Sequence, residues 1–266
     1  AAKPSGADLV GDLAAWYVVT RDVTRTLNGG TAWVLILVHA IVQYPPTTVD
    51  GDTYTWGPWS GDALDPANYR LVVSALGDGS YDWSLDGDSK RTPAADFETV
   101  ISGNAVPGDV EGQGHGDFTI DFDAAERVNP VDNNAAGQVA IAYDLVSRHL
   151  DMAIDGLDSD GVTPVHADYA YQADADGGGN MTFAVHQDTD DAGALAEDAT
   201  VRSRWLATGA GRADVRITGG DLATQQVTGS QCWDSTFGEV YYSDSASFLP
   251  TEGAESDCAF LGADLP

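Results

Sequence analysis

The stretch YQADADGGGNMTF, residues 171–183, decides how the chain around it folds. Its D-x-D-G spacing (174–177) is typical both of a tight turn and of the start of a calcium loop. A calcium loop of the EF type needs oxygen ligands at positions 1, 3 and 5, a glycine at position 6 and an acid at position 12. With Gly177 at the glycine position, the first ligand is Gln172 and the last is Phe183, so the calcium pattern fails.

A hairpin explains the same stretch better. Folding the chain about Asp176 places apolar residues opposite one another on one face of two strands. The predicted pairs are Tyr171 with Met181, Tyr169 with Phe183, and Ala167 with Val185. The second D-x-D-G, residues 158–161, has Gly156 at the first ligand position and fails the calcium pattern too. We therefore predict a turn about Asp176, with adventitious weak calcium binding as the alternative.

The same alternation recurs throughout the chain after residue 50. Runs such as VDGD, LGDGS, LDGD, VPGD and TGGD are typical of turns, and apolar and polar residues alternate between them. In one such run, Tyr81, Trp83 and Leu85 alternate with polar residues. One apolar face and one wet face predict an antiparallel sheet, here of about ten strands in hairpin succession.

The N-terminal part of the chain has a helical pattern over residues 7–44. The run LNGGT (27–31) predicts a break, which gives two helices. The second contains WVLILVHAIV (33–42), which is apolar nearly all round and therefore predicts a helix surrounded by protein. That run is shorter than the roughly 20 residues that cross a bilayer. Pro45 and Pro46 end the helix.

These patterns predict a β-rich α+β protein with one domain over residues 1–266. An N-terminal helical pair (1–48) packs in the concave face of a large curved antiparallel sheet or open β-barrel (49–266), whose C-terminal part carries a disulfide loop. Whether the space between helix 31–44 and the sheet is filled or hollow distinguishes a purely structural domain from a binding domain.

The charge of the chain limits its partners. The 266 residues contain 42 acidic and 12 basic side chains, for a formal net charge of -30. So acidic a surface repels nucleic acid and anionic membrane faces, and we expect neither as a partner. Adaptation to a saline habitat is one explanation of the acidity; the other is that Asp and Gly supply the turns of a β-rich chain.

The chain contains two cysteines, Cys232 and Cys258, and no Cys/His cluster around them. We predict a disulfide between them, with two buried free thiols as the alternative. A disulfide favours an extracytoplasmic location: periplasm, outer-membrane surface or secreted. We expect no transmembrane segment, and membrane association only through an N-terminal anchor that has been removed.

Four of the ten arginines cluster in VRSRWLATGAGRADVRITGG, residues 201–220. With 209–211 as the hairpin loop, Arg204 faces Arg216, and the arginines form a stripe away from Trp205. Either neighbouring Asp side chains pair with this stripe, or it binds an anion such as a carboxylate, a phosphate or a lipid head group. The candidate ligand-binding residues are Arg202, Arg204, Arg212 and Arg216.

The histidines supply a second candidate site. The hairpin about Asp176 places His166 opposite His186, with Asp168 two residues along, and two imidazoles at that spacing can share a metal ion. Exposed histidines without a ligand are the alternative. His39 is expected in the core, and His115 lies in a glycine-rich loop with nothing local to orient it as a base. Motifs for a catalytic serine, a zinc protease, a P-loop or a dinucleotide fold are absent from the sequence.

Several segments carry a resemblance. WGPW, SRWLATGAGRADVRITGGDL and QCWDSTFGEVYY, after a helical start that ends in YPPT, resemble a group of uncharacterised secreted proteins and lipoproteins of myxobacterial type. The resemblance covers most of the chain and implies export but no reaction. In architecture alone, the expected fold is also similar to lipoprotein carriers with an unclosed barrel.

The sequence therefore predicts an exported, non-catalytic domain that binds an amphipathic or anionic ligand, such as a lipid-like small molecule, without a cofactor. One alternative is a structural or surface lipoprotein domain that takes no small ligand. Another is an acid-based hydrolase hidden among the 42 acids.

Overall fold

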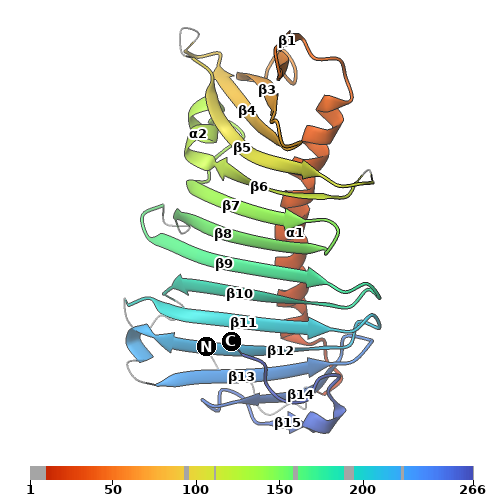
Figure 1. Ribbon diagram of the computed structural model, residues 1–266. Helices are drawn as coiled ribbons and strands as arrows, with labels where there is room; N and C mark the ends of the chain where they lie inside the picture. Colours follow the sequence, from red (N-terminus) through yellow and green to blue (C-terminus); the bar gives the residue numbers. More distant parts are fainter. Residues whose placement is uncertain are drawn as a thin grey trace. The chain divides into compact units, whose positions relative to one another are not determined.

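The computed structural model describes residues 10–92, 96–110, 112–157, 161–188, 195–222 and 225–265. In these ranges the chain forms two α-helices and one antiparallel sheet of fifteen strands, in the order β1 to β15 (Figure 1). The helices are α1 (Ala15–Val42) and α2 (Phe122–Val128). The strands are β1 (Thr48–Asp50), β2 (Thr53–Trp59), β3 (Ala67–Ala75), β4 (Tyr81–Ser89), β5 (Glu98–Pro107), β6 (Gly114–Asp121), β7 (Gly137–Asp144), β8 (His149–Leu157), β9 (Pro164–Ala173), β10 (Gly179–Gln187), β11 (Glu197–Trp205), β12 (Gly211–Gly219), β13 (Gln226–Trp233), β14 (Glu239–Asp244) and β15 (Glu252–Gly253).

The β-rich antiparallel architecture agrees with the sequence, and the described sheet is open rather than closed into a barrel. The described residues form fifteen strands rather than the ten or so expected, and two of these, β1 and β15, are only three and two residues long. The chain divides into two compact units, each described here by itself. Unit 1 comprises residues 1–27 and 167–266, and unit 2 comprises residues 28–166. The expectation of a single domain stays a prediction.

The predicted helical pair is wrong, because α1 is one continuous helix of 28 residues. The helix passes through Gly29 and Gly30, where the sequence predicted a break. A glycine in a helix costs only about 1 kcal/mol relative to alanine, which helical residues on either side can offset. Length and apolar composition make α1 the one described helix that is able to cross a membrane.

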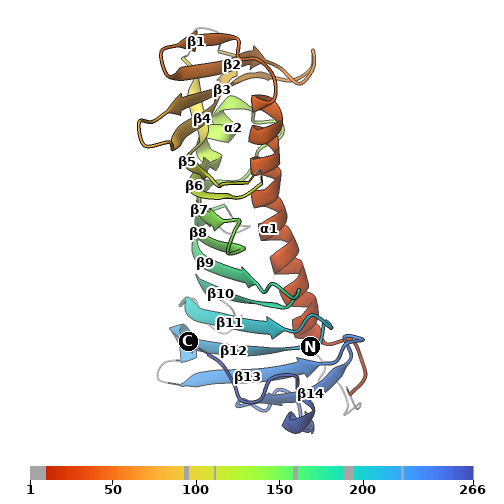
Figure 2. The same cartoon turned by 45° about the vertical axis from the view of Figure 1, so that its right-hand side comes forward.

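The expectation that α1 is surrounded by protein is also wrong. Val34 is buried at 2% exposure, but Trp33 is 61% and Ile36 is 66% exposed. In unit 2 the helix runs across the strands and presents only one side to the sheet (Figure 2). An apolar helix can therefore have one apolar side against the protein and another exposed. Composition alone does not distinguish such a helix from one that is buried all round.

In unit 1 the first turns of α1 are fixed to the sheet by polar contacts. The backbone N–H of Trp16 donates to the side chain of Gln231 at 2.7 Å. The hydroxyls of Thr20 and Ser203, both buried, lie 2.7 Å apart. Tyr17 stacks on Phe237 with ring centroids 4.2 Å apart. These contacts join α1 to β11, β13 and the turn before β14.

The turn about Asp176 is confirmed. The N–H of Asp174 donates to the carbonyl of Gly178 at 2.9 Å, and the N–H of Gly177 donates back to Asp174 at 3.2 Å. Gly177 has a φ of 101°, which favours glycine. The first three residues of the second D-x-D-G, 158–160, lie outside the described residues.

The predicted disulfide is confirmed as well. Cys232 in β13 and Cys258 are joined with an S–S distance of 2.12 Å and a Cα–Cα distance of 5.5 Å. The bond ties the segment after β15 to the sheet of unit 1.

Unit 2 contains β1 to β8 and the short helix α2, which the alternation of the sequence did not predict. Asp121 begins α2 by accepting a hydrogen bond from the N–H of Ala124 at 2.8 Å. Val128 of α2 packs against Gly87 of β4, where an added Cβ would lie 2.4 Å from the valine side chain. Glycine at that position lets α2 pack directly on the backbone of β4.

Candidate functional site

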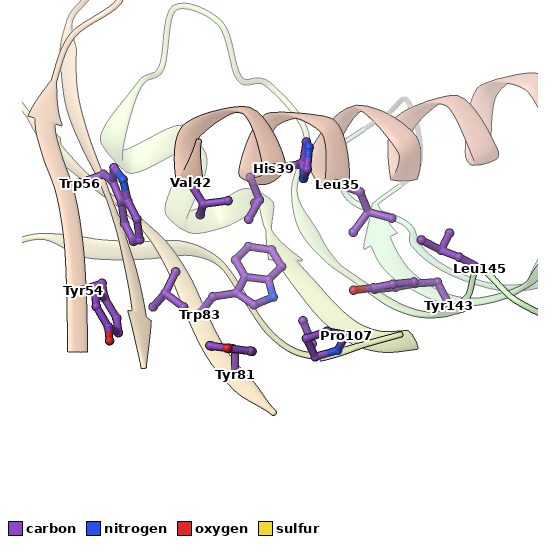
Figure 3. Close-up of a pocket in the computed structure, with 13 residues that line it drawn as sticks. Leu35, His39, Val42, Tyr54, Trp56, Tyr81, Trp83, Pro107, Tyr143 and Leu145 are labelled. Carbon is purple, nitrogen blue, oxygen red and sulfur yellow. The ribbon is translucent and has the colours of Figure 1, made fainter. Parts of the chain in front are cut away.

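The candidate site is a pocket in unit 2, between α1 and one face of the sheet (Figure 3). Its volume is about 520 Å³, within the range of small-molecule sites. The lining residues are Leu35, Val38, His39, Val42, Tyr54, Trp56, Val73, Tyr81, Trp83, Ala105, Pro107, Tyr143 and Leu145. Between residues 35–42 of α1 and the unit 2 sheet, the space is therefore hollow rather than filled.

The register of the strands brings the lining residues together. In one cross-strand row, Tyr54 of β2 pairs with Val73 of β3, and Val73 pairs with Trp83 of β4. In the next row, Tyr81 of β4 pairs with Ala105 of β5. Because residues two apart in a strand share a face, the two rows form one apolar surface.

The helix contributes its lining residues at positions 35, 38, 39 and 42. This i, i+3, i+4, i+7 spacing places them on one side of α1. Trp33 and Ile36 do not belong to that set, which agrees with their exposure.

Two glycines shape the floor beneath the pocket. Gly103 pairs with both Trp83 and Phe118, and an added Cβ would lie 2.6 Å from that of Phe118. Gly116 pairs with Tyr143, and an added Cβ would lie 2.9 Å from its hydroxyl. Because Gly103 and Gly116 carry no side chain, the large rings beside them can pack directly against the sheet. The ring centroids of Trp83 and Phe118 lie 5.9 Å apart.

The chemistry of the lining is mostly apolar. None of its described side chains is an Asp, Glu, Lys or Arg. The polar groups are the His39 imidazole, three tyrosine hydroxyls and the indoles of Trp56 and Trp83, of which the Trp56 indole donates to the carbonyl of Tyr44 at 2.7 Å. Burial raises the pKa of Tyr143, and the nearby carboxylate of Asp117 raises it further, so its hydroxyl stays protonated at neutral pH. A mostly apolar lining with a few polar groups is typical of sites that bind small molecules.

The four predicted arginines lie on one face of unit 1, but the predicted register is wrong. Arg204 faces Arg212 rather than Arg216, Arg202 faces Asp214, and Arg216 faces Thr200. The loop extends from Leu206 to Ala210 instead of 209–211, because Leu206 and Ala210 close it with a 2.9 Å hydrogen bond. The partner of Arg204 is displaced by four residues, an even number, so the arginines keep their common face.

Carboxylates of the protein already occupy this arginine face. Arg212, 1% exposed, contacts Asp214 at 2.8 Å and Glu255 at 2.7 Å. Burial alone would lower the pKa of Arg212, but its hydrogen bonds to Glu255 and Asp214 outweigh burial and raise it. Arg204 approaches Asp214 at 3.5 Å and Asp264 at 3.6 Å. Three of the four guanidinium groups, those of Arg202, Arg204 and Arg212, therefore lie near carboxylates of unit 1.

The disulfide positions the residues that pair with these arginines. Cys232 lies opposite Arg212 in the strand register, on the same face. Its bond to Cys258 holds the segment 255–264 over that face, where Glu255 and Asp264 meet the guanidiniums. The ring of Phe260 lies 5.0 Å from the Arg204 guanidinium carbon.

The histidines predicted to share a metal each contact an aspartate. His166, in unit 2, lies 2.7 Å from Asp155, and His186, in unit 1, lies 2.9 Å from Asp198. In the part of the chain that the structure describes, no group of three or more His, Cys, Asp or Glu side chains is placed to hold a metal ion. The two-histidine metal site stays a prediction.

Sequence reasoning missed the pocket itself. A signal for it was present, since Tyr54, Trp56, Tyr81 and Trp83 are large rings at alternate positions of two strands. His39, expected in the core, lies on the exposed side of the pocket lining. Comparisons of this chain with protein-family models, curated proteins and solved structures found no match.

Proposed function

We propose that this protein is an exported, non-catalytic binding protein that takes up an amphipathic small molecule in the unit 2 pocket. The observation that carries the proposal is the cavity of about 520 Å³ with an almost wholly apolar lining. An apolar cavity of this size stabilises a ligand by removing its apolar surface from water. Export is supported by the disulfide.

We place the ligand in the pocket rather than on the arginines. Arg202, Arg204 and Arg212 already contact carboxylates of the protein, so an anion would have to displace them. The arginine face accordingly has a structural role, which is to hold the C-terminal segment of unit 1.

The test is binding of the neutral fluorescent probe N-phenyl-1-naphthylamine, with variants that fill or spare the pocket. Ala105 lines the pocket, and Ala105→Phe should lower the affinity for the probe at least tenfold by occupying the space. Ala142 is exposed, lies between Ile141 and Tyr143 in β7, and points to the opposite face, so Ala142→Phe is the matched control. Equal binding by both variants, or no binding by the parent, would favour a structural domain without a small ligand.

A further inference from the structure

Rings make up much of the pocket lining. Five of its thirteen lining residues carry Tyr or Trp rings: Tyr54, Trp56, Tyr81, Trp83 and Tyr143. In Figure 3 they surround the hollow below α1, with Tyr54 and Trp56 at one end and Tyr143 at the other. The centroids of Tyr54 and Trp56 are 6.4 Å apart, so two adjoining rings are within reach of one head group.

Aromatic rings have negative faces, and they attract cations that come within about 6 Å of the ring centre. Trp and Tyr are the side chains best suited to this contact. An ordinary apolar cavity for acyl chains needs only aliphatic side chains, but here the aliphatic residues Leu35, Val38, Val42, Val73 and Leu145 share the lining with five rings.

The charges around the pocket also favour a cationic ligand. The described lining contains no Lys or Arg, and His39 is its only titratable nitrogen. The whole chain carries a formal net charge of -30, which draws cations towards it and repels anions.

We propose that the pocket binds an amphipathic organic cation, with its ammonium head against the rings and its apolar body against α1. This inference rests on the proposed function and adds the charge of the ligand to it. The acidity of the chain, which excludes nucleic acid, then serves to concentrate the ligand at the surface. The aliphatic side of the lining, supplied mainly by Leu35, Val38 and Val42 of the helix, covers the apolar body.

The experiment compares two ions with the same chain and opposite charge. Decyltrimethylammonium and decyl sulfate, each below its micelle concentration, compete with N-phenyl-1-naphthylamine at about 150 mM NaCl, where long-range surface attraction is largely screened. We expect the ammonium ion to bind at least tenfold more tightly. Ala105→Phe distinguishes pocket binding from adsorption on the acidic surface, because only pocket binding is lost in that variant.

Ring and charge variants test the mechanism. Tyr81→Leu and Trp56→Leu should each lower the affinity for the ammonium ion about 3-fold to 10-fold, because each removes one ring–cation contact. The affinity for the neutral probe should fall less. Trp33→Leu, an exposed ring outside the lining, is the matched control and should change neither affinity. His39→Lys should lower the affinity for the ammonium ion more than tenfold and leave the affinity for the neutral probe unchanged. His39→Gln should leave both affinities unchanged.

The outcomes separate the two proposals. If the neutral probe binds in the pocket and decyl sulfate matches or exceeds decyltrimethylammonium, the cation inference is wrong and the binding function stands. If Ala105→Phe changes the binding of neither the two ions nor the neutral probe, both proposals are wrong. An affinity for the ammonium ion that is unchanged in Tyr81→Leu, Trp56→Leu and His39→Lys would also overturn the inference.

Discussion

Arg212 is the residue on which the C-terminal segment of unit 1 most depends. It is buried, and it contacts Asp214, which is fully buried. Removing one partner of a buried ion pair leaves an uncompensated charge, so Arg212→Met should lower the free energy of unfolding by about 3–5 kcal/mol. Chemical denaturation measures the loss.

A matched control for Arg212→Met is available on the same face. Arg202 is more exposed and approaches Asp264 only at 3.5 Å, so Arg202→Met should cost no more than about 1 kcal/mol. The double variant Arg212→Met with Asp214→Leu should recover much of the stability, because no charge is then left buried alone. Equal costs for the two single variants would contradict the structural role given to Arg212.

Glu239 gives a pH-dependent prediction. It is 3% exposed, and its Oε1 has no hydrogen-bond partner among the described residues. Burial raises the pKa of Glu239, Glu252 and Asp12 raise it further, and the hydrogen bond from Gln231 lowers it. The folded state therefore binds this proton more tightly than the unfolded state, so the associated stability is present at low pH and is lost as pH rises through the folded pKa.

The variant Glu239→Gln removes that titration while it keeps an acceptor for Gln231. At pH 7 it should be more stable than the parent by about 1 kcal/mol, or about 2–4 °C in Tm. Below the ordinary pKa of a glutamic acid the difference should disappear. Thermal melts of both proteins across this pH range give the comparison, and a constant difference at every pH would show that Glu239 does not titrate as described.

Among the secondary-structure elements, α1 departs most from the expectation based on sequence. An added Cβ at Gly29 or Gly30 would meet nothing within 4 Å, and both residues lie inside the helix. Gly29→Ala and Gly30→Ala should therefore each stabilise the protein by roughly 0.5–1 kcal/mol. Destabilisation by either change would mean that the helix breaks at these glycines, as the run LNGGT suggests. Gly177→Ala is the control that should destabilise the protein, because Gly177 has a φ of 101°.

The disulfide loop makes a second prediction at this scale. Cys232 and Cys258 are 26 residues apart, and removing the bond with Cys232→Ala and Cys258→Ala should cost roughly 3–4 kcal/mol. Because the bond holds Glu255 against Arg212, Glu255→Gln should cost less in the protein without the disulfide than in the parent. Additive costs would show that the segment is held independently of the bond.

How much of these elements the sequence predicts depends on the range of the interactions involved. The turn at 174–178 follows from local residues, and the alternation around Trp83 places its side chain inward, as observed. The predicted partner of Arg204 was wrong by four residues, because the same side chains face the same way in both registers and the facing pattern does not distinguish them. The pocket depends on the register that places Ala105 opposite Gly116, and on which side of α1 faces the sheet, and neither follows from a local pattern.

For the whole molecule, the formal net charge of -30 should govern the response to salt. Like charges on a compact protein repel one another, and salt screens them with a Debye length of about 10 Å at 0.1 M. Raising NaCl from about 20 mM to 500 mM should therefore raise Tm by several degrees, and KCl should act equally. A much larger rise with CaCl₂ at matched ionic strength would indicate specific calcium sites, and a Tm insensitive to salt would contradict the repulsion argument.

The open sheet has one more consequence, which follows from its outermost strands. An unclosed sheet exposes unpaired backbone groups along its edges, and a long flat edge invites other chains to add to it. Here the sheet ends in β1, of three residues including Asp50, and in β15, of two residues including Glu252. Edges this short and acidic offer an incoming strand few hydrogen bonds and a repulsive charge, so we expect concentrated solutions of the protein to resist fibril growth as long as its carboxylates remain ionised.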